Sequence, residues 1–330
     1  MAVFRGLLQR DLQKAFLGLR NMSSEAGLAS YNYATLKVTA PGDHIFHVEL
    51  NRPEKRNAMN KDFWREMVLC FRALSDDCNC RVVVVSGAGK MFTSGIDLMD
   101  LAGDFLQHEE DDAARIAWNV RKKIKDYQES FSVIEKVGVN GALFLYGIHS
   151  IDLMDLAGEF LQHEEDDVAR IAWNVRKKIK DYQESFSVIE KNSPCLLQEV
   201  DVGLAADVGT LQRLPSVIGS RSLASELAFT ARKMMSDEAL SSGFVSRVFP
   251  DKSSLLSACF DLASEIASKS PVAVQGTKVN LVYARDHSVQ ESLDYMATWN
   301  MSMLQTEDIM KSAQAALQKK NPKDVTFSKL

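Results

Sequence analysis

The chain has 330 residues, a net charge of −5 and 46% hydrophobic residues, which predicts a globular protein with one large domain or two small ones. Acidic and basic residues are interspersed, which argues against nucleic-acid binding, and no apolar run reaches the roughly 18 residues that a membrane span requires. The five cysteines fit no disulfide framework, and Cys78 and Cys80 lack the further ligands of a zinc site. We therefore predict a reducing compartment and no metal.

Both ends of the chain resemble targeting segments. Residues 1–33 are predicted to lie outside the folded core, and residues 1–22 combine several basic residues, one acid and apolar residues at helical spacing. That pattern is typical of a mitochondrial transit peptide. Ser328-Lys329-Leu330 is a tripeptide that a peroxisomal import receptor reads, with chance as the alternative explanation. The sequence thus predicts a mitochondrial and a peroxisomal location.

The first core elements predict an α/β fold. His44–Leu50 reads as a strand, and a helix is expected from Asn60 because apolar residues follow at helical spacing. These apolar residues are Phe63, Met67, Phe71 and Leu74. Arg81–Val85 is a β-branched strand that runs into a glycine-rich turn. Strand, helix and strand in this order indicate an α/β protein.

Residues 96–136 recur at 151–191 with differences only at Asp104/Glu159 and Ala113/Val168. Two near-identical copies indicate a recent duplication or an error of gene assembly rather than an evolved repeat. Each copy predicts an amphipathic helix, marked in the first by Ile116, Val120, Ile124, Phe131 and Ile134. We expect the first copy to dock on the sheet and the second to form an extra helix outside the common fold.

After Pro215 the sequence is predicted to be mainly helical. Ser236 is a plausible helix cap and Gly243 a plausible stop. Amphipathic segments follow at Leu255–Ser268 and Val289–Lys319. The stripe of methionines and aromatics in the second segment, which includes Met296, Trp299, Met301 and Met303, is expected to pack in a core or an oligomer interface.

The segment Glu199–Pro215 carries acids in apolar, glycine-punctuated surroundings. If Glu199, Asp201 and Asp207 are buried there, desolvation raises a carboxyl pKa and suits the group to proton transfer near neutral pH. The alternative interpretation is a solvated turn whose acids cap the following helix.

Five segments in order make the chain resemble the crotonase (enoyl-CoA hydratase/isomerase) superfamily, and within it the dienoyl-CoA isomerases. They are Leu50–Asn60, Val82–Leu101, Glu199–Pro215, Glu226–Pro250 and Ser270–Leu281. The resemblance implies a spiral of ββα units in a core at 34–250, then a helical region at 251–330 that trimerises, as a trimer or a hexamer. It also implies an acyl-CoA substrate and no cofactor.

The resemblance implies roles for particular residues. Ile96 N–H would be the first donor of an oxyanion hole, and Ser94, Gly95 and Ile96 would contact the substrate. The alternative for Ser94–Asp97 is a plain helix-entry turn. Lys55, Arg56 and Ala58 would contact CoA, with solvated turn charges as the alternative for the two cations. Glu199 and Asp207 would exchange protons with the substrate.

The chain departs from this family between the second copy and Glu199, where the Gly-rich segment that supplies the second oxyanion donor and a further acid is missing. The linker Val137–Ser150 and the residues after it are a candidate substitute, with Gly147 as donor and Asp152 as acid. The alternative is unrelated sequence that packs by hydrophobicity alone.

The resemblance therefore implies an isomerase that converts 3,5-dienoyl-CoA to 2,4-dienoyl-CoA in fatty-acid β-oxidation. Two alternatives stay open. One is an enoyl-CoA hydratase, against which an acid at Asp207 argues. The other is a catalytically impaired variant that retains oligomerisation but cannot stabilise an enolate.

Overall fold

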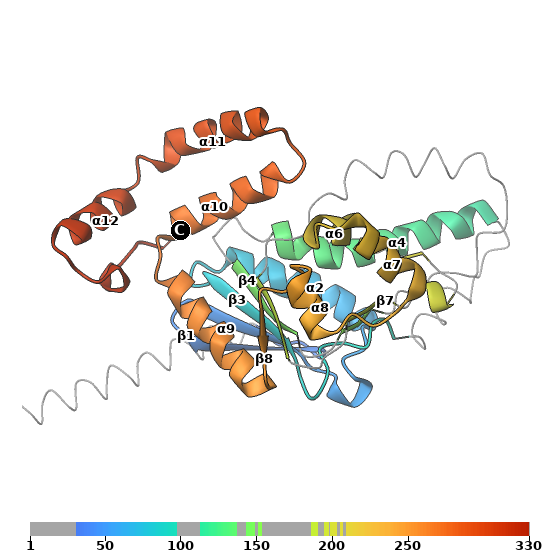
Figure 1. Cartoon of the computed structure of the whole chain (residues 1–330). Coiled ribbons are helices and arrows are strands. Elements are labelled where there is room, and N and C mark those ends of the chain that lie inside the picture. The colour runs from blue at the N-terminus through green and yellow to red at the C-terminus, as the bar shows by residue number, and fades with distance from the viewer. Residues whose placement is uncertain are drawn as a thin grey trace, which may run out of the picture.

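The structure is a computed structural model that describes residues 31–97, 113–136, 143–148, 151–153, 186–190, 195–197, 199–202, 205–206 and 209–329. Its centre is a six-stranded sheet in the order β1-β2-β3-β4-β6-β8 (Figure 1). These strands are β1 Leu36–Gly42, β2 Ile45–Leu50, β3 Val82–Gly87, β4 Leu143–Ile148, β6 Phe186–Glu190 and β8 Arg247–Phe249. β1 and β2 are antiparallel and all later neighbours are parallel, so the predicted α/β class is confirmed.

Strand β3 is buried on both faces, with Val82 to Val85 at most 1% exposed. Because side chains alternate along a strand, Val83 and Val85 join the core under helix α2 (Lys61–Asp76), while Val82 and Val84 pack against α9 (Lys252–Ala267). The molecule is therefore layered, with helices on both faces of a largely parallel sheet.

Helix α2 and helix α4 (Ala113–Lys136) form one of these layers. The Asn60 side chain caps α2 by accepting from Phe63 N at 3.0 Å, and the predicted apolar stripe of α2 is buried. The Trp64 ring stacks on Tyr127 of α4 at 4.6 Å, and Ser130 Oγ donates to Trp64 O at 2.9 Å. The helix predicted in the first copy of the repeat is thus confirmed, and it packs on α2.

The second copy behaves differently from the prediction. Its residues Phe186–Glu190 form β6, between β4 and β8, and Ile189 is fully buried. The identical residues Phe131–Glu135 of the first copy belong to helix α4. The expected extra helix is therefore wrong for this stretch, since open ladders on two neighbouring strands outweigh the weak helix preference of Phe, Val and Ile. Residues 154–185 lie outside the described residues.

The linker between the copies contributes strand β4, which is paired in parallel with β3 on one side and β6 on the other. Its apolar sequence LFLYGI suits a strand covered on both faces. Directly after it, β5 (Ile151–Leu153) pairs with β7 (Cys195–Leu197) in a separate two-stranded sheet. The linker is therefore an integral part of the fold.

Between β7 and α9 the chain forms a 3-10 turn and short helices. They are η2 Glu199–Val202, α6 Thr210–Val217, α7 Arg221–Thr230 and α8 Ser236–Ser241. Ser236 is the first residue of α8 and Met235 is its N-cap, so the predicted cap is shifted by one position. Gly243 follows the end of α8 with φ 77°, as predicted for a helix stop.

The C-terminal helices α10 (Pro271–Ala284), α11 (Val289–Met303) and α12 (Glu307–Leu317) follow, and α11 and α12 lie away from the sheet (Figure 1). The predicted single segment is thus two helices. The ring of Tyr283 on α10 stacks on Tyr295 of α11 at 3.9 Å, but α11 has no buried residue. Large apolar side chains are exposed here, namely Val289, Leu293, Met301, Leu304, Met310 and Leu317. Among the described helices, none is both long and apolar enough to cross a membrane.

Because of the buried His47 on β2, we expect the free energy of unfolding to fall in acid. Its Nε2 lies 2.8 Å from Ser86 Oγ, its ring packs edge-on against Phe260, and burial lowers its pKa below the usual 6.5. The neutral ring therefore stabilises the fold fully above about pH 6.5, and this contribution is lost as the pH falls below that value. Chemical denaturation between pH 7.5 and 5 should show the decline.

The test variant is His47→Gln, and the matched control is His287→Gln. The first should flatten this pH dependence, whereas the second should keep it, because His287 lies at the exposed end of α10 near Asp286. An identical slope in wild type and His47→Gln would contradict the assignment.

Candidate active site

The predicted CoA-binding residues lie on one turn after β2. The turn begins with the 3-10 helix η1 (Pro53–Lys55), and Arg56 and Asn57 adopt left-handed backbone angles, with φ 54° and 56°. Lys55 and Arg56 are exposed, while Ala58 is partly buried. Two solvent-facing cations on one turn can bind an anionic phosphate group.

This turn is joined directly to the segment that carries the predicted oxyanion donor. Met59 N donates to Gly95 O at 2.8 Å, and Asp97 N donates to Met59 O at 2.9 Å. Arg52 forms an ion pair with Asp97 at 3.1 Å, with both side chains largely shielded from solvent. The structure therefore brings the predicted CoA turn and the predicted donor segment together.

Ile96 N–H is the donor that this arrangement leaves available. Ser94 N donates to Arg56 O at 3.0 Å and Gly95 N to Thr93 Oγ1 at 3.1 Å, while Asp97 N is bound to Met59 O. Successive N–H groups of an extended segment point in opposite directions, so Ile96 N–H faces away from Met59. Within the described residues it has no acceptor, and this is the property that an oxyanion donor needs.

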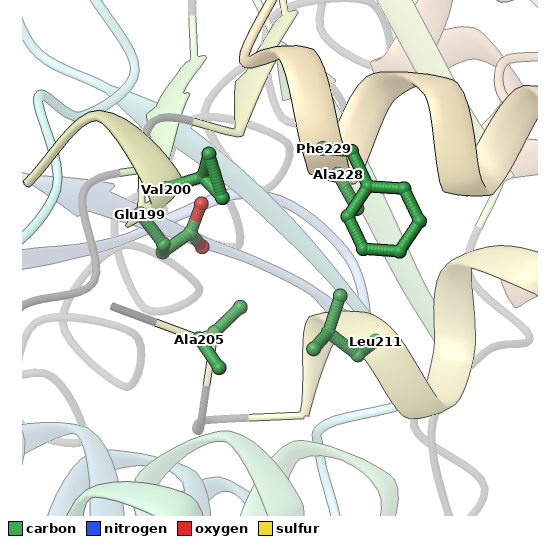
Figure 2. Close-up of a pocket in the computed structure, with 7 residues that line it drawn as sticks. Glu199, Val200, Ala205, Leu211, Ala228 and Phe229 are labelled. Carbon is green, nitrogen blue, oxygen red and sulfur yellow. The ribbon is translucent and has the colours of Figure 1, made fainter. Parts of the chain in front are cut away.

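Glu199 lies at the start of η2 and is only 4% exposed. It lines a pocket whose other walls are apolar, formed by Val200, Ala205, Ala206, Leu211, Ala228 and Phe229. Figure 2 shows the Glu199 carboxyl directed into the space between these side chains. A carboxyl in such surroundings can exchange a proton with an apolar substrate while water is largely excluded.

The other predicted acids and donors have different placements. Asp201 is exposed on the same 3-10 turn, and Asp207 lies outside the described residues. Gly147 is in β4 opposite Ser86 and Val188, and Asp152 is in β5 opposite Leu196. Neither Gly147 nor Asp152 is among the described residues that line the pocket. Their roles stay predictions.

Sequence reasoning missed the walls of the pocket. Leu211 comes from α6, and Ala228 and Phe229 come from α7. Phe229 is 77% exposed, and it lies off the face of α7 that buries Ala224 and Leu227. Phe229, an aromatic residue outside the buried stripe of α7, was a signal for a pocket wall. Helical periodicity alone predicts only that this residue is on the surface.

The chain matches the family model described as Enoyl-CoA hydratase/isomerase over residues 42–137 and 185–324. The chain belongs to this family. The unmatched stretch between the two ranges contains most of the linker and most of the second copy, including β4 and β5. The match resumes just before β6, in agreement with the place of that strand in the sheet.

Several members of the enoyl-CoA hydratase/isomerase family are close relatives. The chain is 55% identical to the mitochondrial Delta(3,5)-Delta(2,4)-dienoyl-CoA isomerase of Rattus norvegicus, covering 95% of this chain and 91% of the relative. It is 34% identical to the peroxisomal Delta(3,5)-Delta(2,4)-dienoyl-CoA isomerase of Arabidopsis thaliana, covering 91% and 99%. The recognised superfamily and its dienoyl-CoA isomerase branch are thereby confirmed.

Solved structures support the fold of this family independently. The enoyl-CoA hydratase of Bacillus anthracis superimposes with a TM-score of 0.69 at 22% identity, covering 87% of this chain and 98% of that one. An enoyl-CoA hydratase/isomerase of Marinobacter aquaeolei gives a TM-score of 0.69 at 18% identity, covering 87% and 98%. The predicted crotonase-like fold is confirmed.

Proposed function

We propose that the chain is a dienoyl-CoA isomerase of fatty-acid β-oxidation, which converts a 3,5-dienoyl-CoA to the conjugated 2,4-dienoyl-CoA. The observation that carries this proposal is the 55% identity, over nearly the whole chain, to an isomerase of that name. The buried Glu199 in an apolar pocket supports it, because the reaction needs a shielded proton-transfer group beside an acyl chain.

The proposed reaction moves one proton out and one proton in. A carboxylate removes a proton from C2, the electron pair shifts both double bonds toward the thioester, and a carboxylic acid delivers a proton to C6. Glu199 and Asp207 are the proposed pair, with Asp152 as a further candidate acid. Because atoms and charge balance within the substrate and these two groups, the reaction requires no cofactor or metal.

Deprotonation at C2 places negative charge on the thioester oxygen. Ile96 N–H is the proposed donor to that oxygen, and one such donor lowers the transition-state free energy by about 3 kcal/mol. Gly147 is the proposed second donor.

Lys55 and Arg56 would bind the CoA phosphates, while the Ala58 backbone would contact the adenine. The Ala58 carbonyl also accepts a hydrogen bond from Arg52 at 2.5 Å. The proposed substrate is therefore an acyl-CoA.

Purified protein mixed with a 3,5-dienoyl-CoA should form the conjugated product, which is followed by its absorbance. Two outcomes would replace the proposal. Addition of water to a 2-enoyl-CoA, without dienoyl isomerisation, would indicate a hydratase. Binding of CoA esters without turnover would indicate a catalytically impaired member of the family, as the missing Gly-rich segment suggests.

The proposed location is the mitochondrion and the peroxisome. Relatives named as mitochondrial and peroxisomal isomerases support both compartments, and Ser328-Lys329-Leu330 is the proposed contact with an import receptor. The proposed organisation is a targeting segment at 1–33, a core at 34–250 with the two copies inside it, and a helical region at 251–330.

We expect the protein to be a trimer or a hexamer in solution. The exposed apolar side chains of α11 and α12 support this, since a large apolar surface is stabilised by burial against another copy. Light scattering of the purified chain should give three or six times the 36.8 kDa of one chain. Replacing Leu293 and Met301 by Lys should shift the mass downward, whereas a wild-type monomer would contradict the prediction.

A further inference from the structure

Two buried polar side chains, Asn57 and Thr93, connect the CoA turn to the residues after β3. Asn57 is 2% exposed, and its Nδ2 donates to Ala88 O at 2.8 Å and to Met91 O at 2.7 Å. Its Oδ1 accepts from Arg52 N at 2.9 Å. Both ends of the amide are therefore used. The Oδ1 bond closes the turn, and the two Nδ2 bonds fix the turn against the chain that leads into the donor segment.

Thr93 completes this connection at the donor itself. It is 3% exposed, and its hydroxyl donates to Asn57 O at 2.8 Å and accepts from Gly95 N at 3.1 Å. Gly95 has φ 87°, a backbone angle that glycine adopts more readily than other residues. The Thr93 hydroxyl thus accepts the hydrogen bond from the N–H of Gly95, the residue before Ile96, and holds that peptide in place.

The donor segment is consequently fixed at two ends. The Met59 backbone holds Gly95 O and Asp97 N, while the Thr93 hydroxyl holds Gly95 N. Gly95 O and Ile96 N–H share one planar peptide, so the Met59 bond sets the direction of this N–H, and the Thr93 bond fixes the Gly95 N–H just before it. Loss of the Met59 contacts would disturb the fold. Loss of the Thr93 hydroxyl leaves the backbone bridge and the bond from Ser94 N to Arg56 O intact, and removes the bond that holds Gly95 N.

We propose that Thr93, supported by Asn57, is a positioning residue that aims Ile96 N–H at the thioester oxygen of the substrate. This inference rests on the proposed function. Thr93 is not placed in contact with the reacting atoms, so it acts through the backbone donor. Because misplacement of a catalytic group by about 1 Å can cost about 100-fold in rate, a single hydroxyl at this point has a large effect.

The test compares Thr93→Val with Thr93→Ser in the full chain. Valine keeps the shape and removes both hydrogen bonds, whereas serine retains the hydroxyl. We expect Thr93→Val to lower kcat for a 3,5-dienoyl-CoA by about 10- to 100-fold and to change KM by less than about threefold. Thr93→Ser should stay within about threefold of wild type. An unchanged kcat in Thr93→Val, or a raised KM alone, would overturn the proposal.

A matched control is Thr277→Val, which removes an exposed threonine hydroxyl that donates to Ala273 O on α10. It should leave kcat unchanged. Thermal unfolding of each variant identifies a loss of fold, and Thr93→Ala serves as the second variant if Thr93→Val does not fold. The same loss of kcat in folded Thr93→Ala supports the proposal, and wild-type kcat overturns it.

A readout that needs no turnover separates this inference from the proposed function. With isoleucine labelled with ¹⁵N, the Ile96 amide resonance should move when a saturated acyl-CoA binds to wild type or Thr93→Ser, and not when it binds to Thr93→Val. Free CoA should bind all three equally. If wild type fails to isomerise dienoyl-CoA, only the proposed function falls. If Ile96 responds equally in Thr93→Val, or not at all in wild type, the positioning role falls.

Discussion

Replacement of Glu199 by Gln is expected to lower the rate of dienoyl isomerisation by about 10²- to 10⁴-fold, the contribution of a positioned proton-transfer group. The amide keeps the size and shape of a side chain that is 4% exposed, but it cannot accept or deliver the proton. Binding of a CoA ester should change little, because Lys55 and Arg56 lie on a different turn. Initial rates from product absorbance, with a separate binding measurement, check both parts.

The neighbouring acid supplies a matched control. Asp201 lies on the same 3-10 turn as Glu199 but is exposed, so Asp201→Asn should leave turnover within about twofold of wild type. Asp207→Asn should resemble Glu199→Gln if the two carboxyls act as a pair. Wild-type turnover in either Glu199→Gln or Asp207→Asn would remove that residue from the mechanism.

Deletion of residues 137–191 is expected to prevent folding. The sequence alone suggested the opposite, since the second copy was expected to form an extra helix outside the common fold. The structure places β4 and β6 in this stretch, between β3 and β8 of the six-stranded sheet. Their removal would separate β3 from β8 and expose the edge of a strand whose four valines are almost completely buried.

Circular dichroism and denaturant unfolding of the deleted chain should show no cooperative transition, together with aggregation during size-exclusion chromatography. The control is deletion of residues 1–30, which removes none of the described elements and should preserve cooperative unfolding. If the chain that lacks residues 137–191 unfolds as cooperatively as wild type, β4 and β6 are dispensable for folding.

Local patterns predicted much of the fold correctly. A helical stripe ahead of a β-branched run identified α2 and β3, and the helix of the first repeat was found from its periodicity. These elements have one strong pattern each, and their burial agrees with it. The same reasoning failed for Phe186–Glu190, because its five residues satisfy both the helical and the strand period and only the neighbouring strands decide.

The candidate site was predictable in part for a related reason. The turn at Lys55 and Arg56, the glycine before Ile96 and the acid at Glu199 are recognisable as short motifs. The walls of the pocket are not, because Leu211 and Phe229 meet Glu199 only through the packing of α6 and α7. The connection between Asn57 and Thr93 depends on a hydrogen bond between residues 36 positions apart in the chain, which no local pattern encodes.

The pentapeptide FSVIE appears in this molecule once as the end of a helix and once as a strand in the middle of a sheet. The same five residues therefore need not take one shape at two places in a chain, because each place supplies different neighbours. A segment can form a strand at such a place if it has apolar residues of suitable size and if the neighbouring strands have unpaired backbone groups. A repeated sequence, whatever its origin, can in this way form two different parts of one domain.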